Sequence, residues 1–212
     1  DPAGADILLD NGRRWSEAVK DLGGDVLMLV PGGRRDEPPY GLDDFTRMAE
    51  TMNQVGRVAR ETGAVAAMHP HWGTMAESQL EIEVLLDRLD PDAVGFAPDT
   101  GQIAKGGADP IPMIDRWADR VQRVHLKDLS PRWQEMRKTG VPLRSPEGYC
   151  ELGQGIIDLR PLLPILDRVG YAGWLMAELD EASRPAREAA ELSRDYLART
   201  LGLPFAPIDK DF

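Results

Sequence analysis

The chain has 212 residues, 42% hydrophobic and 29% charged, which is ordinary for a soluble globular protein and enough for one domain spanning residues 1–212. Its net charge of -11 argues against a nucleic-acid-binding surface, which needs clustered lysine and arginine, and suits a neutral substrate or a cation site. No apolar run approaches the roughly 20 residues of a membrane span, and a single cysteine, Cys150, excludes an internal disulfide and suits a reducing compartment such as the cytoplasm.

Helices and short apolar strands alternate along the chain. Strands are predicted at residues 25–33, 64–68, 93–100, 121–129 and 171–180, and helices at about residues 12–23, 43–62, 79–89, 112–120, 158–170 and 184–201. Phe45, Met48 and Met52 have helical spacing, whereas continuous apolar runs such as DVLMLV are typical of strands covered on both faces. This order predicts an α/β fold with a parallel sheet.

Two segments interrupt this order. Residues 101–110, GQIAKGGADP, are predicted to form a glycine-rich loop. Residues 130–158 contain several prolines and glycines and show no clear periodicity, so they predict a long loop of the kind that usually has a function.

Each of the last four predicted strands ends in polar side chains. These are His69 and His71, then Asp99, then His125 and Lys127, and finally Glu178 and Asp180. Functional side chains at the carboxyl ends of several strands are typical of a (β/α)8 TIM-type barrel. A doubly wound sheet is the alternative, although no GxGxxG motif follows a strand. Five strands are visible where a barrel needs eight, so we expect that the first three are absent from this chain.

The three histidines and two of the acids predict a metal site. His69 and His71 are two residues apart at a strand end, so both point to one face. With Asp99, His125 and Glu178 they offer mixed nitrogen and oxygen ligands, which suit Mn²⁺ or Co²⁺ first, with Zn²⁺, Fe²⁺ or Mg²⁺ as alternatives. A histidine taken singly is more often a surface or hydrogen-bonded core residue, and an aspartate followed by Thr-Gly is commonly a turn former.

Other polar and aromatic residues have two interpretations each. Lys127 can hold a substrate hydroxyl, polarise a carbonyl or act as an acid, or it is a solvated lysine at a strand edge. Trp72 is packing or a pocket wall, and Glu151, in the long loop, can line the pocket. Asp128 and Asp180 either orient histidines or cap helices. Cys150 has no basic neighbour in sequence and is expected to be inert.

The motifs HPHWGT, PDTGQ with GGADP, RVQRVHLKDL, ELGQGIIDL and GYAGWLMAELD occur in the order found in a known superfamily. From about residue 64 to residue 200, the chain resembles the xylose-isomerase-like TIM-barrel superfamily of sugar isomerases and epimerases, and within it the inosose (2-keto-myo-inositol) dehydratases. The resemblance implies that Asp99, His125 and Glu178 are metal ligands, with His69 where the superfamily has a glutamate. Gln102 stands where a histidine commonly follows DTG, and ELGQG replaces a PGDG-like turn.

The resemblance implies a metal-dependent lyase or isomerase that acts through an enediolate on a keto-cyclitol or ketose. The metal would be the Lewis acid, Glu178 or a histidine such as His71 the base, and Lys127 the acid. Trp72, Gln102 and Glu151 would contact the substrate. The alternatives are a sugar isomerase or epimerase, a phosphoesterase acting on abasic DNA, which the net charge opposes, and a non-catalytic sugar-binding relative. Two unpaired sheet edges further predict self-association.

Overall fold

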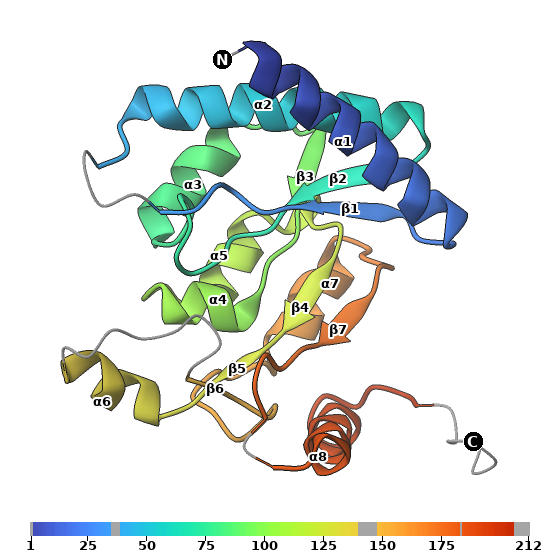
Figure 1. Cartoon of the computed structure of the whole chain (residues 1–212). Coiled ribbons are helices and arrows are strands. Elements are labelled where there is room, and N and C mark those ends of the chain that lie inside the picture. Colours follow the sequence, from blue (N-terminus) through green and yellow to red (C-terminus); the bar gives the residue numbers. More distant parts are fainter. Residues whose placement is uncertain (1, 35–38, 140–147, 183, 206–212) are drawn as a thin grey trace.

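The structure, a computed structural model, describes residues 2–34, 39–139, 148–182 and 184–205. The strands are β1 (Val26–Leu29), β2 (Val65–Met68), β3 (Val94–Phe96), β4 (Val124–Leu126), β5 (Asp128–Leu129), β6 (Tyr149–Cys150) and β7 (Leu175–Ala177) (Figure 1). The helices are α1 (Pro2–Asp21), α2 (Leu42–Glu61), α3 (Gln79–Arg88), α4 (Thr100–Lys105), α5 (Pro110–Arg116), a 3₁₀ turn (Ala118–Arg120), α6 (Arg132–Lys138), α7 (Leu162–Arg168) and α8 (Ala186–Arg199).

Five of the strands follow one another in a parallel arrangement, as the sequence predicts. The strands β1, β2 and β3 pair in that order, and β4 pairs with β7. Two parallel bridges, from Phe96 to Val121 and from Asp99 to His125, connect the β3 segment to the β4 segment. In the described ranges no strand pairs with the outer edge of β1 or β7, so the sheet stays open there.

An ion pair shows that the sheet curls. Arg123, just before β4, donates to the carboxylate of Asp25, just before β1, at 2.7 Å. The strands β2 and β3 lie between β1 and β4, so in a flat sheet the backbones of these two residues would lie about 14 Å apart. The ion pair therefore joins the amino ends of β1 and β4 across a curved sheet, as in a barrel.

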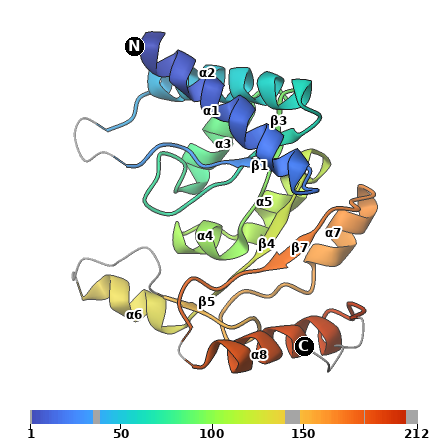
Figure 2. The ribbon, with the colours of Figure 1, turned by 45° about the vertical axis from the view of Figure 1, so that its right-hand side comes forward.

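The helices pack as amphipathic elements around this sheet. Figures 1 and 2 show α1 and α2 packed together at one end of the molecule and α8 at the opposite end, with the strands between them. In α2, Phe45, Ala49, Met52 and Ala59 are buried at helical spacing. Helix α3 begins at a capping box in which Ser78 accepts from the backbone of Glu81. No helix of the described residues is both long and apolar enough to cross a membrane.

The structure corrects three predicted element boundaries. Helix α1 begins at Pro2 and not near residue 12, because proline is tolerated in a first turn and Gly12 gives room to Val55 of α2. Half of the predicted glycine-rich loop is helix α4, capped by Asp99. The long irregular segment contains α6 and the antiparallel pair of β5 and β6, while its residues 140–147 lie outside the described ranges.

Candidate metal centre

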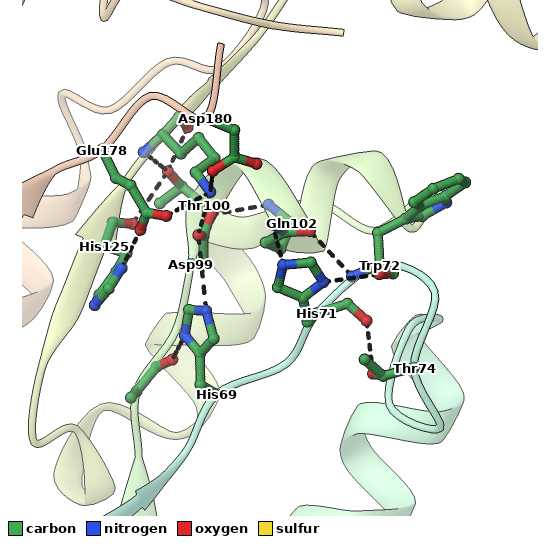
Figure 3. A network of polar contacts seen from close by, with 12 residues as sticks. His69, His71, Trp72, Thr74, Asp99, Thr100, Gln102, His125, Glu178 and Asp180 are labelled. Atoms are coloured by element: carbon green, nitrogen blue, oxygen red, sulfur yellow. Dashed lines mark hydrogen bonds and ion pairs between the residues drawn. The ribbon is translucent and has the colours of Figure 1, made fainter. Parts of the chain in front are cut away.

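Three of the predicted ligands meet at the carboxyl ends of neighbouring strands. His69 follows β2, Asp99 follows β3 and His125 lies in β4. One ligand atom from each lies within 4.8 Å of the other two, and the side chains of all three residues are buried. Figure 3 shows Asp99 next to the two imidazoles, with a dashed line from its carboxylate to His69. This is the only such group among the described residues.

The hydrogen bonds around these residues leave basic atoms free in the middle. His69 Nδ1 lies 3.0 Å from the carbonyl of Ala97, which can only accept, so Nδ1 carries the proton and Nε2 keeps its lone pair. His125 Nδ1 bonds to Glu178, and His125 Nε2 has no hydrogen-bond partner. Asp99 Oδ2 forms no hydrogen bond, but it makes an ion pair with Lys127 Nζ at 3.3 Å. Two imidazole nitrogens and a carboxylate oxygen without hydrogens are a donor set that fits a divalent transition-metal ion. The contact with Glu178 has the form of a carboxylate that orients a metal-binding histidine.

A single buried ammonium lies beside three carboxylates. Lys127, 1% exposed, places Nζ 3.3 Å from Asp99, 2.9 Å from Glu178 and 2.8 Å from Asp180. Its stem packs on Gly101, where an added Cβ would lie 2.7 Å from Lys127 Cγ. With neutral imidazoles and ionised carboxylates, the group has one positive and three negative charges, which a divalent cation would balance.

Burial and these contacts shift several pKa values. Burial, reinforced by His125, lowers the pKa of His69 to about 4, so this imidazole is neutral at pH 7. Burial raises the pKa of Asp99 above its ordinary value. The hydrogen bond from His125, followed by that from Lys127, holds the pKa of Glu178 well below its usual range. Burial lowers the pKa of Lys127, but Asp99, Asp180 and Glu178 together raise it above the usual value.

Glu178 has a cationic partner that lies far from it in sequence. The sequence shows no basic residue near Glu178, which made a metal ion its expected counter-charge; Lys127 supplies one from a neighbouring strand. The side chain of Glu178 is about one-third exposed and lies beside the three-residue group through His125. Its roles as a direct metal ligand and as a base stay predictions.

His71 lies next to the centre, and both of its ring nitrogens have partners. Its ring centroid is 6.1 Å from that of His69. Nδ1 lies 2.8 Å from the carbonyl of Trp72, and Nε2 accepts from the amide of Gln102 at 2.9 Å. Gln102 also accepts from the Trp72 backbone at 3.0 Å. These hydrogen bonds among His71, Trp72 and Gln102, drawn in Figure 3, fix the orientation of His71. The catalytic role of His71 and the substrate contacts of Trp72 and Gln102 stay predictions.

The remaining acidic candidates hold loops and cations. Glu151 is buried and accepts from Arg184 at 2.8 Å, and its contact with substrate stays a prediction. Asp180 pairs with Lys127. Asp128 neither caps a helix nor orients a histidine: its carboxylate accepts from the backbone N–H groups of Leu129, Gly153, Gly155 and Ile157.

Sequence reasoning overlooked two groups near the centre. The hydroxyl of Thr100 donates to the carbonyl of Lys127 at 2.7 Å and accepts from its N–H at 3.0 Å, which fixes the strand that carries His125. Its position directly after Asp99 was the available signal. Tyr149 is buried with its ring centroid 4.8 Å from Lys127 Nζ. It lies in the segment without periodicity, where the sequence offered no signal.

The chain is similar in sequence to curated relatives. The inosose dehydratase of Lacticaseibacillus casei is 31% identical over 175 residues, covering 80% of this chain and 59% of the relative. That of Klebsiella pneumoniae (strain 342) is 32% identical over 176 residues, covering 79% of this chain and 58% of the relative. The chain thus spans less than two thirds of the length of these curated relatives.

Solved structures show the same fold. The IOLI protein, whose crystal structure contains a bound zinc atom, has a TM-score of 0.72 at 18% identity, covering 97% of this chain and 73% of that chain. The probable 3-DHS dehydratase AsbF of Bacillus anthracis has a TM-score of 0.70 at 12% identity, covering 89% and 69%. Residues 3–199 match the family described as xylose isomerase-like TIM barrel. The chain therefore belongs to the xylose isomerase-like TIM barrel family.

Proposed function

We propose that this chain carries the divalent-metal centre of a lyase or isomerase that acts on a keto-cyclitol or ketose through an enediolate, and that inosose is the first substrate to test. The observation that carries the proposal is the buried group of His69, Asp99 and His125, in which His125 Nε2 has no hydrogen-bond partner and Asp99 Oδ2 has only its ion pair with Lys127. The bound zinc of the IOLI protein and the inosose dehydratase names of the relatives support it.

The proposed chemistry assigns distinct tasks to the residues. A metal ion bound by His69, Asp99 and His125 would polarise the substrate carbonyl and acidify the neighbouring C–H bond. Glu178, which stays ionised at neutral pH, would accept the α-proton after leaving His125 Nδ1. Lys127, which three carboxylates keep protonated, would donate a proton to a substrate oxygen. In dehydration this oxygen belongs to the hydroxyl that leaves, and in isomerisation it is the oxygen that is reprotonated. Trp72, Gln102 and Glu151 would line the substrate site, with His71 as the alternative base.

The first experiment tests the metal site by thermal denaturation. The chelator-treated chain should melt at a higher temperature after addition of Mn²⁺, Co²⁺ or Zn²⁺, because a ligand that binds only the native state stabilises it by mass action. His125→Ala should lose that response. Asn53→Ala is a control that changes a buried residue of α2 outside the centre, so its metal response should remain. An equal response in His125→Ala would remove the centre from the proposal.

The second experiment tests the reaction class. Solvent deuterium exchange at the carbon next to the carbonyl should occur with 2-keto-myo-inositol or with one of a set of ketoses. Exchange followed by loss of water indicates a dehydratase, and exchange with an isomeric product indicates an isomerase or epimerase. Metal binding without exchange on any of these substrates would instead indicate a non-catalytic sugar-binding relative.

A further inference from the structure

The hydroxyl of Tyr149 has no hydrogen-bond partner although it is buried, and the ring that carries it lies next to Lys127. Tyr149 is 7% exposed, and its oxygen is without a partner in the described part of the chain. A buried hydroxyl that makes no hydrogen bond destabilises the folded state, so it calls for a functional explanation. His125 Nε2 is without a hydrogen-bond partner in the same way, but that atom accepts a hydrogen bond or binds metal, whereas a neutral phenol also donates.

Local structure fixes the position of Tyr149 next to the segment that carries Lys127. Strands β5 and β6 pair antiparallel and place Tyr149 opposite Leu129, two residues after Lys127. Gly148 precedes it at φ +94°, and a Cβ there would lie 2.5 Å from the ring of Trp133. Only glycine allows this close approach at that backbone conformation. The backbone of Tyr149 is therefore held against Trp133.

Two ammonium groups hold the phenol ring. Lys127 Nζ lies 4.8 Å and Lys105 Nζ 4.5 Å from its centroid. Lys105 is fully buried and also lies 4.4 Å from the ring of Trp72 and 4.5 Å from that of Trp133. Such cation–π contacts favour the flat face of an aromatic ring, so they restrict its rotation. These contacts therefore hold the ring of Tyr149 in place before a substrate binds.

The electrostatic surroundings keep the phenol protonated. Lys127 Nζ contacts Asp99, Glu178 and Asp180, so the ring lies one contact away from three carboxylates. Burial raises the pKa of Tyr149 far above its ordinary value, and these three acids raise it further. The hydroxyl can therefore offer its proton, and a hydrogen-bond acceptor in the centre would satisfy it.

We propose that Tyr149 is a substrate-contacting residue whose hydroxyl donates a hydrogen bond to an oxygen of the keto-cyclitol or ketose bound at the metal centre. This inference rests on the proposed function. It adds a specificity-determining group from β6 to the side chains that come from the ends of β2, β3, β4 and β7. The Tyr149 hydroxyl can donate a hydrogen bond to a substrate oxygen, whereas the ionised carboxylates around Lys127 can only accept one.

The test separates substrate contact from a structural role. Tyr149→Phe in the 212-residue chain should leave the melting temperature unchanged or higher, because the lost hydroxyl had no partner. Mn²⁺ affinity should change less than about 2-fold, because the three ligand residues are untouched. Affinity of the Mn²⁺-loaded chain for 2-keto-myo-inositol, measured by calorimetry, should fall about 10-fold, as for loss of one hydrogen bond.

Tyr171→Phe is the matched control. Its hydroxyl donates to the carbonyl of Trp174 at 2.8 Å, just before β7 and at the other end of that strand from the centre. This variant should melt at a lower temperature and bind 2-keto-myo-inositol as the parent does. If the parent binds Mn²⁺ and 2-keto-myo-inositol, and Tyr149→Phe binds 2-keto-myo-inositol as tightly as Tyr171→Phe does, the inference alone is wrong. If the parent binds neither, the proposed function is wrong and the inference goes with it.

Discussion

Glu178 forms the connection between His125 and Lys127, so it carries the sharpest prediction at the scale of single residues. Glu178→Gln keeps the size of the side chain and removes the anion. Metal affinity should fall at least ~10-fold, because even loss of a supporting carboxylate has that effect, and solvent deuterium exchange should be lost. Titration calorimetry and exchange measure the two effects.

Asp180→Asn provides the control for Glu178→Gln. Asp180 also contacts Lys127, but no contact with His125 is recorded for it, so its metal affinity should stay close to that of the parent. A Glu178→Gln variant that binds metal and exchanges deuterium as well as the parent would remove Glu178 both as a ligand support and as the base.

Lys127 stabilises the metal-free centre, because it is the cation shared by three carboxylates. Lys127→Met leaves the fully buried Asp99 without its counter-charge, which should lower the free energy of unfolding by on the order of 3 kcal/mol. Added Mn²⁺ should then raise the melting temperature more in the variant than in the parent. A metal-free variant as stable as the parent would show that the ammonium is dispensable.

Cys150 gives the pH-dependence prediction. Burial, followed by the charges of Asp128 and Glu151, raises the pKa of its thiol to about 12. The unfolded thiol titrates near about 8.5, so above that pH the unfolded state holds fewer protons than the folded state, and the free energy of unfolding falls as pH rises. Between about pH 8 and 9.5, denaturant unfolding of Cys150→Ala should depend less on pH than that of the parent. If the free energy of unfolding depended equally on pH in both proteins, the raised pKa of Cys150 would be contradicted.

Residue types at strand ends were sufficient to predict that His69, Asp99 and His125 lie close together, because a parallel sheet brings the ends of its strands together. The partners of these residues could not be predicted in the same way. The pairing of Lys127 with Glu178 and the position of Tyr149 depend on contacts between segments that are far apart in sequence. Sequence spacing carries no information about such contacts.

At the scale of elements, Asp128 holds the loop that follows β6. Its two oxygens accept from four backbone N–H groups, those of Leu129, Gly153, Gly155 and Ile157. Asp128→Asn replaces one acceptor with a donor that faces backbone donors, so the free energy of unfolding should fall by about 2–3 kcal/mol. Chemical denaturation measures it. Asp158→Asn, in the same loop but at the exposed Arg160 ion pair, should leave the stability close to that of the parent.

The misjudged elements share one cause. In α4 the glycines of GQIAKGGADP suggested a loop, but the side chain of Asp99 accepts from the Gln102 N–H, and Gly106 and Gly107 end the helix. Helix α6 and strand β6 were hidden because seven residues and two residues are too short for a clear periodicity. Helix caps and short strand pairs depend on a few hydrogen bonds, which the periodicity of apolar residues in the sequence does not reveal.

At the scale of the whole molecule, the open sheet leaves apolar surface uncovered. The outer edges of β1 and β7 are unpaired in the described ranges, and Met176 of β7 is 39% exposed. Helix α1 and the turn that follows it add exposed apolar residues at seven-residue spacing, Leu8, Trp15 and Leu22, exposed at 50%, 65% and 88%. Exposed apolar surface next to unpaired strand edges favours association between chains.

The 212-residue chain should therefore self-associate in a concentration-dependent manner. Introducing a charge at either place, as Met176→Lys or Leu22→Lys, should shift the distribution toward monomer in sedimentation velocity, because a buried unpaired lysine opposes an apolar contact. Leu80→Lys changes another exposed leucine, at 70%, on α3 and should have no such effect. A parent chain that remains monomeric at all concentrations and unfolds cooperatively would mean that these edges are covered within the chain. The strand count on which both the open sheet and the predicted association depend would then be wrong.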